Sequence, residues 1–327
     1  MTVRFVIDSA SDMVELACPC QEATLGSDML AGDGARAPRA DDVLAGDGAR
    51  APRADEVVGD AFLPLTVAFC DEQGNREEYL DGITLSHAEF YEKLIESDEL
   101  PKTSQVVPYA FEEVFERIVS AGDTAVVVTI SGKLSGTYES ACAAAHGYEG
   151  KVFVVDSESA TIGERILIER GMHLRDQGMD AADIACALDR EKRNICVLGL
   201  LDTLEYLRRG GRISAAVATA GTLLSIKPVI TIEDGEVVLL GKARGSKKGN
   251  NLLIQAIEKV GGVDFSKPYA LAYSGLNDDL IRKYMQDSRH LWADHVEDLP
   301  IRTVGSAIGT HVGPGAIAVA FFAKGRE

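Results

Sequence analysis

The sequence predicts an α/β protein of two domains. The N-terminal domain, residues 1–158, is expected to hold a doubly wound, mostly parallel sheet, and the C-terminal α+β domain, residues 159–327, a mixed or antiparallel sheet. Up to about residue 158, short β-branched runs alternate with helical segments, which is typical of a parallel sheet with crossover helices. Beyond it, two consecutive helical segments and an Asp-Gly hairpin signal break this alternation.

The first half is predicted to contain four strands and three helices. The strands are the apolar runs Val3–Ile7, Ala61–Cys70, Val126–Ile130 and Lys151–Asp156. One helix covers Ser86–Ser97, where Ser86 and Glu89 fit a capping box. Another begins near Tyr109 with Pro108 at its start, and the third covers Tyr138–Ala145.

A duplicated segment interrupts the first half. LAGDGARAPRAD occurs at 30–41 and again at 44–55. Two copies are too few for a solenoid, and Gly, Ala, Pro and charged residues dominate them. We therefore interpret residues 21–59 as a mobile surface insertion without a role in the chemistry.

The second half is predicted to mix helices and strands without a regular alternation. The expected helices are Thr161–Gln177, Ala181–Glu191, Leu204–Arg209, Asn251–Val260 and Asp278–Asp287. The expected strands are Ile195–Leu201, Lys227–Ile232, Glu236–Gly241, Tyr269–Tyr273 and Ala316–Phe322. Gly210-Gly211 ends the short helix, and Glu233-Asp234-Gly235 predicts the hairpin turn.

Composition narrows the classes of function. The net charge is −18, and residues 1–100 carry 22 acidic against 7 basic side chains, which argues against nucleic acid or an anionic membrane as the main partner. The six cysteines show neither zinc spacing nor a disulfide framework. No signal peptide and no membrane-spanning run is evident, so a cytoplasmic protein is expected, without metal or cofactor.

The loop 131–137 is the first candidate site. It follows the buried strand Val126–Ile130 and precedes a helix for which Ser135 is the expected N-cap. In an open α/β sheet, ligands bind beyond the carboxyl ends of the strands, and a helix N-terminus attracts anions. In the alternative interpretation the hydroxyl groups only cap the helix, and the loop alone does not decide between the two.

Three other loops of small residues are candidates: 103–105, 210–214 and 305–315, the last carrying His311 among glycines. A similar hydroxyl cluster at 8–12 is interpreted as a turn. Ser135 and His311 could form the nucleophile–base pair of an esterase or acyl transferase, although no acidic third member can be assigned. The loop from Ser131 to Thr137 could instead bind a phosphate or nucleotide, although it has no P-loop motif.

Several long motifs in order resemble the DegV family of bacterial fatty-acid-binding proteins. They are DSASD at 8–12, KTSQ at 102–105, ISGKLSGTYESA at 130–141, VVDSESA at 154–160, LDTLEYLRRGGRIS at 201–214, IKPVITIEDGEV at 226–237, KARGSKKG at 242–249 and IGTHVGPGAIAVAF at 308–321. The resemblance covers nearly the whole chain except residues 21–59.

This resemblance implies a carrier and not an enzyme. A long-chain fatty acid would lie between two α/β domains, its tail in an apolar tunnel, and a separate ATP-dependent fatty acid kinase would phosphorylate its carboxylate. By motif, Thr103 and Ser135 contact the carboxylate and His311 lies next to it. Ser104, Ser131 and Gly132 belong to the same group, and neutral donors would hold the head without a trapped cation.

Two further expectations follow from the resemblance. Gly132 stands where the family commonly has a second serine, so one donor would be lost. The basic residues of the second half become a possible docking face for the kinase: Arg208, Arg209, Arg212, Lys242, Arg244, Lys247 and Lys248.

Overall fold

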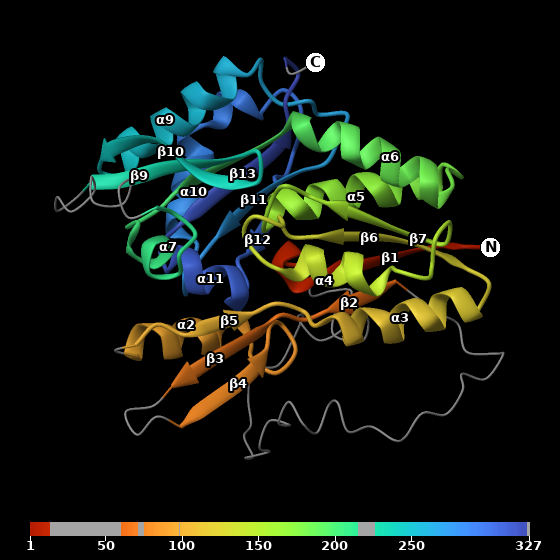
Figure 1. Cartoon of the computed structure of the whole chain (residues 1–327). Helices are drawn as coiled ribbons and strands as arrows, with labels where there is room; N and C mark the ends of the chain where they lie inside the picture. Colours follow the sequence, from red (N-terminus) through yellow and green to blue (C-terminus); the bar gives the residue numbers. More distant parts are fainter. Residues whose placement is uncertain (14–59, 71–74, 98, 215–225, 326–327) are drawn as a thin grey trace, which may run out of the picture.

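The computed structural model of the chain describes residues 1–13, 60–70, 75–97, 99–214 and 226–325 (Figure 1). The predicted insertion at 21–59, with both copies of the repeat, lies outside these residues. The helices and strands form layers, in which helices separate and cover two larger sheets (Figure 1).

The first sheet is entirely parallel, as the sequence predicts. Its order is β2-β1-β6-β7, and the strands are β1 (Val3–Asp8), β2 (Ala61–Leu63), β6 (Thr124–Thr129) and β7 (Val152–Asp156). All six residues of β6 are buried, because helices cover both faces of the sheet. One face is covered by α3 (Pro108–Ser120) and α4 (Thr137–Ala144), the other by α5 (Ile162–Asp176) and α6 (Ala181–Glu191).

A second, small antiparallel sheet was not predicted. Its order is β4-β3-β5, with β3 (Thr66–Cys70), β4 (Arg76–Leu80) and β5 (Lys102–Ser104). The predicted single strand Ala61–Cys70 is therefore wrong: Pro64 and Leu65 divide it into β2 and β3, which lie in different sheets. Proline cannot donate to a sheet ladder, which explains the break. The charged, exposed start of β4 conceals that strand from an apolar-run criterion.

The third sheet is mixed, as predicted for the second half. Its order is β10-β9-β8-β13-β11-β12, and the strands are β8 (Ile195–Leu200), β9 (Ile226–Glu233), β10 (Glu236–Arg244), β11 (Tyr269–Tyr273), β12 (Ile301–Thr303) and β13 (Ile317–Phe322). The β9–β10 hairpin is confirmed, with Asp234 and Gly235 at positive φ in its turn. Helices α9 (Ser246–Lys259) and α10 (Asp279–Asp287) cover the outer face.

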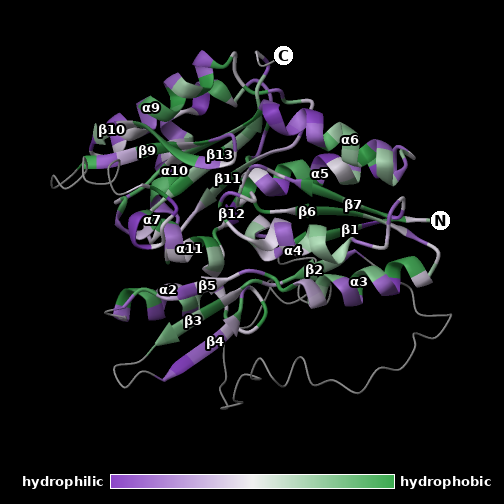
Figure 2. Cartoon of the chain, in the orientation of Figure 1, coloured by the Kyte–Doolittle hydropathy of each residue, from purple (hydrophilic) through white to green (hydrophobic). Residues whose placement is uncertain are grey.

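Helix α5 lies between the parallel sheet and the mixed sheet (Figure 1). Two glycines permit this close approach. A Cβ at Gly163 would lie 2.3 Å from a methyl of Val197 in β8, and one at Gly171 would lie 2.8 Å from the ring of Phe5 in β1. Figure 2 shows the resulting hydropathy pattern, with hydrophobic strands inside and hydrophilic residues on the outer helical surfaces. The proposed boundary at 158/159 falls in the turn between β7 and α5.

Several helix predictions are confirmed and one loop prediction is corrected. The Ser86–Glu89 capping box begins α2 (His87–Glu96), and Pro108 is the first residue of α3. The predicted glycine-rich loop 305–315 contains α11 (Ser306–Val312). Glycine lowers helix propensity, but here Gly309 lets α11 pack tightly: a Cβ would lie 2.5 Å from the Phe90 ring. A short helix α7 (Glu205–Arg209) ends at Gly210.

Candidate functional site

A cavity of about 360 Å³ lies between the mixed sheet and the elements of the first half. Its walls are apolar over most of their extent. The aliphatic residues that line it are Leu65, Ile130, Leu134, Ala160, Val197, Leu201, Leu207, Ile230, Ile232, Val237, Val304, Ala307, Ile308, Val312, Ala316, Ile317 and Ala318. Such a volume is in the range of small-molecule sites, and such walls favour an apolar ligand.

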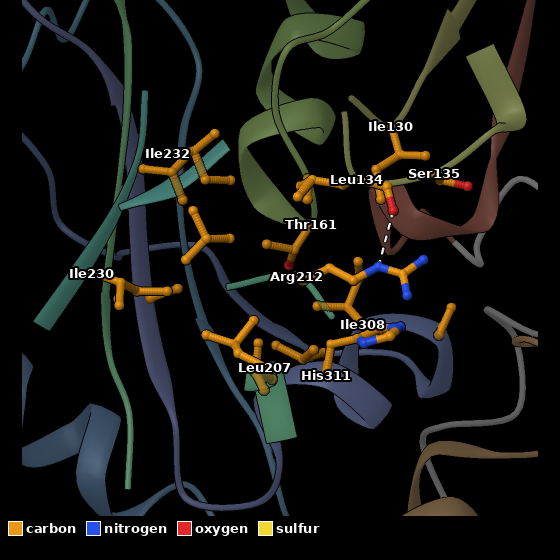
Figure 3. Close-up of a pocket in the computed structure, with 18 of the residues that line it drawn as sticks. Ile130, Leu134, Ser135, Thr161, Leu207, Arg212, Ile230, Ile232, Ile308 and His311 are labelled. Atoms are coloured by element: carbon orange, nitrogen blue, oxygen red, sulfur yellow. Dashed lines mark hydrogen bonds between the residues drawn. The ribbon is translucent and has the colours of Figure 1, made fainter. Parts of the chain in front are cut away.

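Polar side chains gather at one end of the cavity. Figure 3 shows Ser135, Arg212 and His311 on one side, while Ile230 and Ile232 of β9 lie on the opposite side. Thr103 also lines the cavity, and its Oγ1 lies 3.0 Å from Nε2 of His311. We call Thr103, Ser135, Arg212 and His311 the head-group end. Each comes from a different part of the chain: β5, the loop after β6, the segment after α7, and α11.

His311 is electrically neutral at physiological pH. Burial and the nearby cation of Arg212 lower the pKa of His311 to about 4. The imidazole therefore has one donor and one acceptor nitrogen. Nε2 faces Thr103, whereas buried Nδ1 has no hydrogen-bond partner among the described residues. Gly210 makes room for this ring, because a Cβ there would lie 2.1 Å from Nδ1.

Arg212 is the residue whose role the sequence misplaced. It lies in the candidate loop 210–214, but its side chain was expected on a docking surface, and the head-group end was expected to hold no cation. Instead its half-buried side chain lines the cavity, donating from Nε to the Leu134 carbonyl at 3.0 Å and from Nη1 to the Gly210 carbonyl at 2.6 Å (Figure 3). Burial lowers the pKa of Arg212, yet arginine stays protonated in proteins. The head-group end therefore carries a positive charge.

The loop after β6 orients Ser135 but leaves few free donors. The N-cap of α4 is Gly136 and not Ser135, whose Oγ accepts from the Thr137 N–H at 3.3 Å and pairs with its Oγ1 at 2.9 Å. The N–H groups of Leu134 and Ser135 both donate to the Ser131 carbonyl. A nest of free N–H groups for a phosphate is therefore absent from the described loop.

Ser131 and Gly132 do not line the cavity. Ser131 is buried and donates to the Gly235 carbonyl at 2.8 Å, which ties the loop to the β9–β10 turn. Gly132 donates its N–H to the carboxylate of Asp156 at 3.2 Å, and a Cβ there would lie 3.0 Å from the Tyr138 ring. A serine at 132 would therefore meet a packed neighbour instead of the cavity. Ser104 does line the cavity.

Sequence motifs match one family over most of the chain. A family model described as "Uncharacterised protein, DegV family" matches residues 59–324. The chain belongs to the DegV family. A DegV domain-containing protein from Halalkalibacterium halodurans is 33% identical over 81% of this chain and 92% of its own length. Another, from Caldanaerobacter subterraneus, is 30% identical over 80% of this chain and 91% of its own length.

Solved structures of DegV proteins share this fold. A DegV family protein from Thermus thermophilus, described as fatty-acid binding, is 28% identical, with a TM-score of 0.76 over 99% of this chain and 100% of its own. The fatty acid kinase B3 protein from Streptococcus pneumoniae, solved with linoleic acid, is 22% identical, with a TM-score of 0.75 and coverage of 99% and 100%. The DegV fold is thus present along the described chain.

Two polar lining residues of this DegV chain were not among the candidates from the sequence: Thr161 and Thr231. A third, Gln105, lies in the candidate loop 103–105 but was given no role of its own. Gln105 is in the quoted KTSQ motif, and its amide donates to Ser140 Oγ at 2.7 Å. Thr161 follows the strand β7 and donates to Asp12 at 2.5 Å. Strand-end position was a usable signal for Thr161. Thr231 sits inside an apolar β9 and gave no such signal.

The remaining basic residues of the predicted docking face are on the surface. Arg208 and Arg209 both pair with Glu205 of α7. Exposed basic side chains of β10 and the start of α9 complete the group: Lys242, Arg244, Lys247 and Lys248.

The described residues contain no group of three or more His, Cys, Asp or Glu side chains suited to a metal ion. Nor does any helix among them have the length and apolar character needed to cross a bilayer.

Proposed function

We propose that this DegV protein binds a long-chain fatty acid in the cavity, with the carboxylate at the head-group end. The observation that carries the proposal is the asymmetry of the cavity: apolar walls over most of its length, and Thr103, Ser135, Arg212 and His311 together at one end. A carboxylate matches two hydroxyl donors, a neutral imidazole and one cation. The fatty-acid binding described for the Thermus thermophilus relative supports the same ligand class.

The two ends of the cavity would contribute differently to affinity. Burying about 14 methylenes at about 0.8 kcal/mol each contributes on the order of 11 kcal/mol before the costs of association. Hydrogen bonds to a charged group add about 1.5–3 kcal/mol each. The tail therefore supplies most of the affinity, while the head-group end fixes the orientation of the ligand.

We extend this proposal to a carrier role, in which the protein presents the carboxylate to a separate ATP-dependent fatty acid kinase. The resemblance stated above suggests this role. Arg244, Lys247 and Lys248 are exposed basic residues that would meet an acidic face of such a partner. Kinase association should then weaken as salt rises, because exposed charges are screened. Association that is independent of salt would contradict docking through these residues.

The alternative function, an esterase, requires a nucleophile–base pair of Ser135 and His311. His311 Nε2 pairs with Thr103, and Ser135 Oγ pairs with Thr137, so the described structure does not join Ser135 to His311. A carboxylate next to the loop disfavours phosphate binding there, because Asp156 already accepts from the N–H of Gly132. A phosphate or nucleotide site also leaves the apolar cavity without a role.

Native mass spectrometry of protein purified from a bacterial host tests the binding, followed by solvent extraction and lipid analysis. One fatty acid bound per chain is the expected result. An empty protein that also takes up no added palmitate or oleate would overturn the proposal. Labelling of Ser135 by a serine-directed probe would favour the esterase, and stabilisation by ATP or phosphate alone would favour the anion-binding loop.

A further inference from the structure

Two buried carboxylates of the first half hold the segment that leads into α11. Asp12 accepts the N–H of Gly305 at 2.8 Å. Asp81 accepts both the N–H of Ser306, at 2.8 Å, and its hydroxyl, at 2.5 Å. Asp12 is 7% exposed and Asp81 2%. These three hydrogen bonds fix the first residue of α11 and the one before it.

Gly305 allows both carboxylates to approach. A Cβ at this position would lie 2.9 Å from Oδ1 of Asp12 and 3.2 Å from Oδ1 of Asp81. Both carboxylates therefore lie close to the side of Gly305 on which a Cβ would project. The preceding carbonyl, of Val304, is held as well: His87 Nδ1 lies 3.1 Å from it, and the Tyr91 hydroxyl donates to it at 3.2 Å.

Helix α11 is thus anchored in the first half, although it connects two strands of the mixed sheet. It is only seven residues long. Four of its residues line the cavity: Ala307, Ile308, His311 and Val312. His311 lies five residues after Ser306, about 7.5 Å along the axis. A shift at the start of so short a helix therefore moves His311 relative to Thr103.

Asp12 also holds a second part of the cavity wall. Its Oδ2 accepts from the hydroxyl of Thr161 at 2.5 Å, and its backbone carbonyl accepts from Arg165 at 3.1 Å. Thr161 lines the cavity and immediately precedes α5, the helix between the two larger sheets. One carboxylate therefore connects α11, α5 and the turn after β1.

We propose that Asp12 and Asp81 are positioning residues, which set α11 and through it the place of His311 at the head-group end. The role in ligand binding rests on the proposed function. Burial raises the pKa of Asp12 to about 7 and also raises that of Asp81, so both carboxylates are costly to keep buried. A requirement for placing α11 explains why acids occupy these positions.

The test uses Asp81→Ala, the conservative Asp81→Asn and the mild Ser306→Ala, with Asp123→Ala as matched control. Asp123 is 8% exposed and accepts from the Thr2 N–H and from Arg4, but it does not line the cavity. Three quantities are measured on the full chain: the thermal midpoint, the affinity for palmitate, and the imidazole NMR signals of His311, assigned with His311→Gln.

We expect Asp81→Ala to shift the His311 signals and to weaken palmitate binding about tenfold, the equivalent of about 1.4 kcal/mol. Asp81→Asn keeps an acceptor for Ser306, so most of the palmitate affinity and the wild-type positions of the His311 signals should be restored. Asp123→Ala should lower the thermal midpoint without changing the palmitate affinity or the His311 signals. Unchanged His311 signals in Asp81→Ala and in Ser306→Ala would overturn the inference, whether or not the wild type binds palmitate. If Asp81→Ala does not fold, the His311 signals of Ser306→Ala test the inference in its place. Absence of palmitate binding by the wild type would overturn only the proposed function.

Discussion

The Nε2 atom of His311 lies 3.0 Å from the Oγ1 atom of Thr103, although 208 residues separate them in the chain. The first belongs to α11, the second to the edge strand β5 of the small antiparallel sheet. Both residues line the head-group end of the cavity, so their contact joins the two halves of the molecule there. The distance between these two atoms therefore depends on how the two halves of the molecule pack together.

Replacing Thr103 or Ser135 by Ala should weaken orientation of the head more than retention of the lipid. Each change removes one hydroxyl donor, worth about 1.5–3 kcal/mol when the partner is charged, while the apolar walls stay intact. Lipid content per chain is measured by mass spectrometry, and acyl-phosphate formation by adding a fatty acid kinase and ATP. Thr84→Ala, which removes a hydroxyl that accepts from the Leu80 N–H outside the cavity, is the control. Parallel loss of both quantities would contradict the division between head and tail.

Arg212→Gln should reduce the preference for a fatty acid over the corresponding fatty alcohol. Arg212 is the cation that lines the cavity at this end, so its charge distinguishes a carboxylate from a hydroxyl group. Competition binding with palmitate and hexadecanol measures the ratio, which should fall about tenfold. Arg209→Gln is the matched control, because Arg209 is exposed and pairs with Glu205. An unchanged ratio would show that the hydroxyls and His311 alone select the carboxylate.

The free energy of unfolding should fall as the pH rises from 4 to 7. Burial raises the pKa of Asp8 and of Asp12 from 3.8 to about 7, so the folded state binds more protons than the unfolded state between these values. Their stabilising contribution is complete below pH 3.8 and is lost through pH 7. His311, whose pKa is lowered to about 4, opposes this trend as a single group.

Urea unfolding at several pH values measures this slope. Asp8→Asn should make it shallower between pH 4 and 7, because the variant has one titrating carboxyl fewer in the folded core. General repulsion in a chain of net charge −18 is nearly the same in both proteins. Equal slopes would contradict the assignment of the effect to Asp8.

Glu164→Met should stabilise the protein. Glu164 is 0% exposed, and neither carboxylate oxygen has a hydrogen-bond partner among the described residues. Burial, followed by the charges of Asp8 and Asp12, raises the pKa of Glu164 well above its usual range. Removing an unsatisfied buried group of this kind gains about 1–3 kcal/mol. The exposed Glu112→Met on α3 is the control for added apolar surface, and a loss of stability in Glu164→Met alone would reveal an unrecognised partner.

Local sequence patterns were sufficient to predict the elements that depend on neighbouring residues alone. The uniformly buried β6, the β9–β10 turn and the Ser86–Glu89 capping box could all be predicted from neighbouring residues. Strand β4 could not, because its charged residues face solvent. Helix α11 could not either, because tertiary packing of Gly309 against Phe90 compensates for poor helix propensity.

Sequence motifs were sufficient to predict most of the polar residues of the site, but not its positive charge. Thr103, Ser135 and His311 were candidates from hydroxyl-rich or glycine-rich loops, and all three line one cavity. Arg212 lies in the candidate loop 210–214, but its charge grouped it with the arginines of the preceding helix. Only the fold shows that it turns inward to the Leu134 carbonyl, while Arg208 and Arg209 stay outside with Glu205.

Gly210 and Gly211 should respond differently to the same change. A Cβ at Gly210 would lie 2.1 Å from Nδ1 of His311, so Gly210→Ala must displace that ring and weaken binding of the carboxylate. Gly211 has φ +73 with nothing within 4 Å of its Cβ position, so Gly211→Ala strains the backbone by about 1 kcal/mol but leaves the cavity unchanged. Palmitate affinity and thermal midpoint, measured for both variants, separate the two effects. Equal affinities in the two variants would mean that His311 tolerates displacement, and the head-group end would then depend on Thr103, Ser135 and Arg212.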